Sequence, residues 1–202
     1  VEPVGLWRRK ARFQNRRQWY YLYLDAASTS SEQGDRTEAA SSFPTEQAAA
    51  MRFFRTHKVE RGGKLPWTLE KMTADLSVAF ASGDRDEIAQ KAGHLVAFCT
   101  FAADPFHVTR NHRGKETGNA VFASAAMGDP FFAHQDVAQR FGWELIRRYS
   151  NRYREALDKE SFKYSLDFDA RSTIFETLLD SLDSLSASCQ ADHDTLSRMG
   201  TN

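Results

Sequence analysis

The sequence has few cysteines, no long apolar run and no excess of charge of either sign. Its two cysteines, Cys99 and Cys189, fit neither zinc-finger nor thioredoxin spacing. We expect Cys99 to be a small apolar residue buried in a helix rather than half of a disulfide. No apolar stretch approaches the roughly 20 residues that span a bilayer. Basic and acidic residues number 27 each, so no net charge attracts the chain to nucleic acid or an anionic membrane.

What is present is an ordinary globular composition. The chain has 202 residues, 41% hydrophobic and 12% aromatic, which is enough for one well-buried domain. Charge is uneven only near the start, where the first seventeen positions contain six basic residues and one acidic residue, Glu2. Such a run favours a solvated or partner-facing edge over nucleic-acid binding. The chain begins at Val1 rather than Met, which predicts a processed or truncated product.

Helical patterns dominate from about residue 44 onward. The expected helices lie at 45–59, 65–82, 84–99, 133–159 and 168–186. Local signals mark their ends: Pro66 suits a first helical turn, Gly83 suits a helix end, and Asp84 begins a capping box with Glu87. We expect long loops near 28–43 and 108–132.

These patterns predict an all-α helical bundle with an irregular N-terminal arm. Residues 1–43 form a basic, aromatic arm and loop, residues 44–190 an all-α domain, and residues 191–202 a polar tail that we expect to fray.

Short motifs follow one another through the middle of the chain. They are YYLYLD at Tyr20–Asp25, GKLPW at Gly63–Trp67, Gly83-Asp84, Pro105-Phe106-His107, NHRG at Asn111–Gly114 followed by Thr117-Gly118, and VAQRFG at Val137–Gly142. In this order they resemble the motifs of the zinc-dependent phospholipase C and S1/P1 nuclease family, over about residues 16–150. The resemblance implies an all-α bundle of that type and a periplasmic or secreted protein. It also implies a cleft in which three zinc ions hydrolyse phosphate esters.

The same resemblance implies where metal ligands would stand, and most of those positions have lost their donors. The ligand in the Pro-x-His motif is kept as His107. The other ligand positions that can be aligned fall on Tyr20, Ala97, Phe101, Ala138 and Gly142. Alanine, phenylalanine and glycine bring no donor, and a phenol with a pKa of about 10 is a poor zinc ligand at neutral pH.

Two interpretations of the remaining polar residues stay open. A reduced or relocated zinc site could be built from His107, Asp104, His94, His112 and His134. Alternatively, His107 is a loop histidine hydrogen-bonded to backbone, Asp104 ends a helix and starts a turn, and the others are ordinary surface groups.

The predicted function is therefore that of a non-catalytic relative of this family, a structural or accessory subunit that binds a protein partner and needs no cofactor. Candidate contact residues are Arg8, Arg9, Arg12, Trp19 and Tyr21. The alternative is a zinc-dependent phosphodiesterase, either phospholipase C or nuclease, that uses the reduced site.

Overall fold

The computed structural model describes residues 18–29, 33–112, 137, 145–159 and 169–198. The chain divides into two units, residues 1–110 with 169–183 and residues 111–168 with 184–202. Over the described ranges the secondary structure is helical, and the β-type pairing is one isolated antiparallel bridge between Leu22 and Gly63. The predicted all-α class is confirmed. None of the helices in these ranges is long and apolar enough to cross a membrane.

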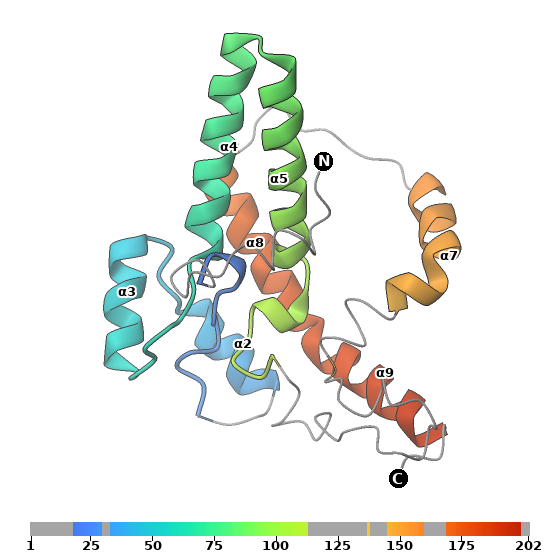
Figure 1. The fold of residues 1–202 in the computed structure, drawn as a ribbon. Coiled ribbons are helices and arrows are strands. Elements are labelled where there is room, and N and C mark those ends of the chain that lie inside the picture. Colours follow the sequence, from blue (N-terminus) through green and yellow to red (C-terminus); the bar gives the residue numbers. More distant parts are fainter. Residues whose placement is uncertain (1–17, 30–32, 113–136, 138–144, 160–168, 199–202) are drawn as a thin grey trace. The chain divides into compact units, whose positions relative to one another are not determined.

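The first unit contains most of the described helices. They are α2 (Gln33–Ser41), α3 (Gln47–Thr56), α4 (Leu65–Ser82), α5 (Arg85–Ala102), the short 3-10 helix η2 (Pro105–His107) and α8 (Ala170–Asp183). Helices α4 and α5 form an antiparallel hairpin, and α8 packs against both of them as well as against α2 and η2 (Figure 1). Because α8 meets all four elements, its residues Leu178 and Leu182, both 0% exposed, lie at the centre of this core.

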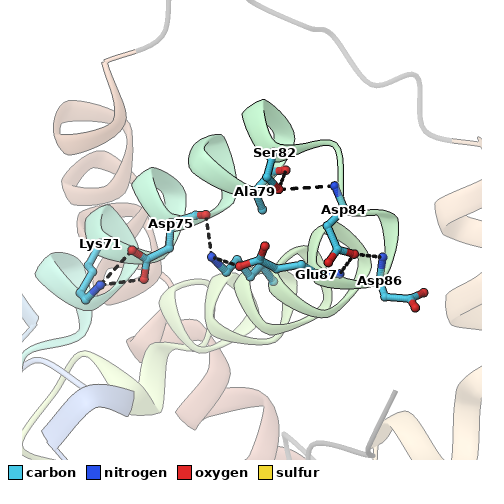
Figure 2. Close-up of polar contacts among 8 residues, drawn as sticks. Lys71, Asp75, Ala79, Ser82, Asp84, Asp86 and Glu87 are labelled. Carbon is cyan, nitrogen blue, oxygen red and sulfur yellow. Dashed lines mark hydrogen bonds and ion pairs between the residues drawn. The ribbon is translucent and has the colours of Figure 1, made fainter.

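The α4–α5 hairpin has the ends that the sequence predicts. Pro66 lies in the first turn of α4, and Gly83 ends that helix with a left-handed φ of 73°. Asp84 then caps α5, because its carboxylate accepts hydrogen bonds from the backbone N–H of Asp86 (3.0 Å) and of Glu87 (3.1 Å), as Figure 2 shows. The Nζ of Lys91 donates to the carbonyl oxygen of Asp75 (3.1 Å), which ties α5 to α4.

Two segments expected to be irregular are helical. Residues 28–43 were predicted to be a loop, but α2 occupies 33–41 within them. Its sequence is polar and has weak helical periodicity, so the helix depends on burial of Arg36 and Ala40, which are 1% and 3% exposed. The expected fraying of residues 191–202 is also wrong in part, because α9 (Leu185–Arg198) in the second unit continues through most of this tail.

The predicted helices toward the end of the chain also change. A single helix over 168–186 is replaced by α8 and α9, with Ser184 between them. Of the long helix predicted over 133–159, the structure describes α7 (Leu145–Lys159), which contains a non-helical residue, Tyr149, at φ −117° and ψ 23°. The loop predicted at 108–132 lies outside the described residues from 113 onward.

The buried face of α5 is not the one that carries Cys99. We expected Cys99 to be buried in its helix, but its thiol is free and exposed, and Val96 on the same helix is 64% exposed. The residues that are buried are Phe98 and Phe101, 2% and 6% exposed. Large aromatic side chains bury more apolar area than valine or cysteine, and their packing determines how the helix is rotated.

Candidate functional site

Segment 20–25 is held between two other parts of the first unit. Three of its N–H groups donate to them: Leu22 N–H to the His107 carbonyl (2.9 Å), Leu24 N–H to the Val108 carbonyl (3.1 Å) and Tyr23 N–H to the Gly62 carbonyl (2.8 Å). The segment therefore joins the chain around η2 to the loop that precedes α4. Three of the motifs noted in the sequence, YYLYLD, GKLPW and Pro-x-His, meet here.

Glycine at position 63 is required by this arrangement. Its φ is +95°, and a Cβ added there would lie 2.0 Å from the carbonyl oxygen of Tyr21. The backbone of Leu22 bridges to Gly63 at this point, so a side chain would force the two strands of chain apart.

Four rings pack together where segment 20–25 meets α5 and η2, and we call them the aromatic cluster: Tyr20, Phe98, Phe101 and His107. The ring centroid of Tyr20 is 5.3 Å from that of Phe98 and 5.5 Å from that of Phe101. The imidazole of His107 stacks on Phe101 at 4.7 Å, with an interplanar angle of 29°. Such tilted and edge-to-face pairs stabilise a core beyond the area they bury.

His107 is bound to backbone through one of its ring nitrogens. Its Nδ1 lies 2.6 Å from the carbonyl oxygen of Tyr20. A carbonyl can only accept, so Nδ1 carries the proton and donates it. Its Nε2 lies 3.7 Å from the Oδ2 of Asp104, and that carboxylate also caps η2 by accepting from the Phe106 N–H (2.9 Å). The backbone hydrogen bond expected of His107 and the capping role expected of Asp104 are both present.

The donors gathered here do not fit the zinc cluster that the resemblance implies. His107 and Asp104 bring at most two ligands, whereas a zinc ion takes three or four protein ligands. Tyr20 and Phe101 occupy ligand positions with packed rings, and Ala97, half-buried on α5, supplies no donor. Over the ranges that can be described, no three His, Cys, Asp or Glu residues are grouped to hold a metal ion. We therefore derive no reaction step through zinc.

The other candidate residues are not part of this cluster in the described structure. His94 is half-buried on α5, and His112 is exposed and belongs to the second unit. Trp19 directly precedes segment 20–25 and Tyr21 belongs to it, and both residues are half-buried. The remaining candidates lie outside the described residues: His134, Ala138, Gly142, Arg8, Arg9 and Arg12.

A buried ion pair lies beside the aromatic cluster, and the sequence analysis missed it. The Arg36 guanidinium pairs with the Asp25 carboxylate, and the two side chains are 1% and 0% exposed. Asp25 also accepts from the Thr109 hydroxyl (2.6 Å) and the Arg110 N–H (2.9 Å), and Arg36 donates to Thr109 as well (3.0 Å). Arg36 was overlooked because it falls in the segment predicted as a loop. The only available signal was an aspartate closing an aromatic, extended run.

Tyr21 and Tyr23 stack on each other with their centroids 4.8 Å apart. The Tyr21 hydroxyl donates to the carbonyl oxygen of Arg61 (3.1 Å). Burial raises the pKa of Tyr21, and the positive charge of Arg61 opposes that rise. Burial, with smaller contributions from Tyr21 and Asp25, raises the pKa of Tyr23 to about 12. Both phenols are therefore protonated, neutral groups at physiological pH.

Comparison with known proteins supplies no relative, because no family model, no curated protein and no solved structure matches the chain.

Proposed function

We propose that this chain is a non-catalytic relative of the zinc-dependent phospholipase C and S1/P1 nuclease family, and that it acts as a structural or accessory subunit bound to a protein partner. The aromatic cluster is the observation that carries the proposal. Tyr20, Phe101 and His107 come from three separate segments, and all three stand at positions that the resemblance assigns to metal ligands. Their side chains converge as ligands of one centre would, but they meet as packed rings.

The physical chemistry of this cluster supports a metal-free protein. A family ligand at position 101 would be a carboxylate, and Phe101 is only 6% exposed. A carboxylate buried there without a metal would carry a large desolvation cost. Phenylalanine removes that cost and adds apolar burial, so the substitution suits a protein that no longer binds metal at this place.

A role in binding another protein is supported by the residues next to the cluster. Trp19 and Tyr21 are only half-buried, and the basic run with Arg8, Arg9 and Arg12 precedes them in the sequence. Tryptophan, tyrosine and arginine are the residue types enriched at protein interfaces. We propose that the chain is periplasmic or secreted and that a protein partner contacts this part of it.

One observation favours a second candidate function, a zinc-dependent phosphodiesterase with a reduced site. The hydrogen bond from His107 Nδ1 to a backbone carbonyl leaves Nε2 as the unprotonated nitrogen, and metal-binding histidines use the same arrangement. The Oδ2 of Asp104 lies 3.7 Å from that nitrogen. In this alternative the two residues hold zinc together with ligands from outside the described ranges.

Metal content separates the two functions. The purified protein, dialysed without chelator, is measured by inductively coupled plasma mass spectrometry, and hydrolysis of bis(p-nitrophenyl) phosphate is assayed with added zinc. We expect far less than one zinc per chain and no hydrolysis that depends on His107. One zinc per chain that is lost together with activity in His107→Ala would overturn the proposal and establish the phosphodiesterase.

The interaction role has its own test. The complex is first isolated from the native source. Purified wild type or a Trp19→Ser/Tyr21→Ser double variant is then added to it, and each mixture is sized by gel filtration at low and moderate salt. We expect the wild type to exchange into a larger species and the variant to remain at the size of the free chain. Equal behaviour of the two proteins would remove these residues from the interface.

A further inference from the structure

A cavity of about 560 Å³ lies in the first unit at the C-terminal end of α3. Its apolar lining comes from Met51, Phe54 and Val59, and its charged lining includes Arg55 and Lys58. The volume is in the range of natural small-molecule sites, which combine an apolar wall with a few placed polar groups. The aromatic cluster contributes no residue to this lining, so the cavity is a separate feature of the unit.

Lys58 has a backbone conformation that normally selects glycine. Its φ is +56°, in the left-handed region. The Lys58 N–H donates to the Arg55 carbonyl (3.1 Å) and the Val59 N–H to the Phe54 carbonyl (2.8 Å), which is the Schellman arrangement that ends a helix. A lysine at this position is less favourable than glycine. The side chain of Lys58 lines the cavity.

The apolar wall is built by a close approach that only glycine allows. A Cβ on Gly62 would lie 2.3 Å from the Phe54 ring, so the ring rests directly on the Gly62 backbone. Phe54 is itself 3% exposed and held in place by Phe43, with the two ring centroids 5.4 Å apart. The Phe54 side of the wall is therefore held in place.

The charge of the lining indicates the sign of the ligand. Arg55 and Lys58 supply two positive charges and Glu60 one negative charge, which leaves one positive charge in excess. We propose that the cavity binds a small carboxylate with an apolar chain, with the chain against Met51, Phe54 and Val59 and the carboxylate beside Lys58 and Arg55. This inference does not depend on the proposed function.

Octanoate is a suitable probe because it combines one carboxylate with one flexible chain, and 1-octanol is its neutral counterpart. The full chain is titrated with each compound while the backbone amides of Gly62 and Gly63 are followed by ¹H–¹⁵N NMR. We expect octanoate to shift both amides with saturation and to bind about fivefold more tightly than octanol, as one partly exposed ion pair allows.

Lys58→Gly makes the test specific, because the variant relieves the backbone strain while it removes the charge. We expect it to unfold at a higher denaturant concentration than wild type and to bind octanoate about fivefold more weakly, with octanol binding unchanged. Arg52→Gln, an exposed change on α3 outside the cavity, is the matched control and should leave binding unaltered. Absent shifts at Gly62 and Gly63, equal binding of the two probes, or equal octanoate binding by the two variants would each overturn the proposal.

Discussion

The Arg36 guanidinium and the Asp25 carboxylate form an ion pair that is closed to solvent on both sides. The pair joins α2 to segment 20–25, and Thr109 completes the network from the chain that follows η2. A buried pair of this kind is weak evidence for stability by itself, but loss of one partner leaves a buried charge uncompensated. The packing of α2, of segment 20–25 and of the chain after η2 is therefore interdependent.

Replacement of Arg36 by methionine should be strongly destabilising. The change removes the positive charge and leaves Asp25 buried, so we expect the free energy of unfolding to fall by about 3–5 kcal/mol. Urea unfolding followed by circular dichroism measures this, with the exposed Arg52→Met as control. The double variant Asp25→Asn/Arg36→Met should recover part of the loss, because no buried charge remains. A cost for Arg36→Met as small as that of the control would contradict the buried network.

Two glycines with positive φ offer a matched comparison. Gly83 has φ +73° with nothing within 4 Å of an added Cβ, whereas Gly63 has φ +95° and a Cβ there would lie 2.0 Å from the Tyr21 carbonyl oxygen. We expect Gly83→Ala to cost about 1 kcal/mol for the backbone conformation alone. Gly63→Ala should cost roughly 3 kcal/mol, because crowding adds to that conformation. Equal losses in denaturant unfolding would mean that segment 20–25 does not pack on Gly63.

The cap of α5 can be tested with two substitutions at one position. Asp84→Ala removes the acceptor for the N–H groups of Asp86 and Glu87, and we expect it to lower the free energy of unfolding by about 1 kcal/mol. Asp84→Asn keeps an acceptor oxygen and should change stability by only a few tenths of that amount. If both variants lose the same stability in thermal unfolding, the charge at the helix N-terminus matters more than the hydrogen bonds.

Helix ends were predictable from the sequence because the signals for them are local. Pro66, Gly83 and Asp84 act through their own backbone or the next few residues, and they perform the roles that the sequence predicts. The buried face of α5 was not predictable. Phe98 and Phe101 are buried because they meet Tyr20, a residue far away in the sequence, and no local pattern reports that contact.

The sequence also predicted part of the candidate site. Its motifs identified His107, Asp104, Tyr20 and Phe101 as candidate residues, and these four residues do lie together. Helix α2 and its Arg36 were missed because a polar segment becomes helical only through tertiary burial, which propensity cannot report.

The raised pKa of Tyr23 predicts a change of stability at alkaline pH. In the unfolded chain the phenol loses its proton near pH 10, whereas in the folded protein it keeps the proton until about pH 12. The unfolded state therefore binds fewer protons between these values, and stability falls as pH rises through this window. Wild type and Tyr23→Phe are compared by urea unfolding from pH 9 to pH 11. The variant should lose less stability, and parallel curves would show that Tyr23 is not the group responsible.

Position 101 provides the sharpest test of how the aromatic cluster relates to metal. Phe101→Leu keeps an apolar side chain and should cost about 1.5 kcal/mol or less, whereas Phe101→Asp places a carboxylate, the ligand type that the resemblance implies, at a position that is 6% exposed. We expect Phe101→Asp to cost more than about 4 kcal/mol, since it combines the loss of a buried phenylalanine with an unpaired buried charge.

The response of these variants to zinc then tests whether the fold still places ligands around one centre. A metal that binds the folded state raises stability in proportion to the logarithm of its concentration over its dissociation constant. If His107 and Asp104 are only structural, as proposed, zinc leaves the unfolding midpoint of Phe101→Asp and Phe101→Leu equally unchanged. A zinc-dependent rise confined to Phe101→Asp, and abolished by adding His107→Ala, would show that the fold still places ligands around one centre. Because the carboxylate is supplied by the substitution, that result would describe the geometry of a lost site and would not by itself show that the wild-type chain binds zinc.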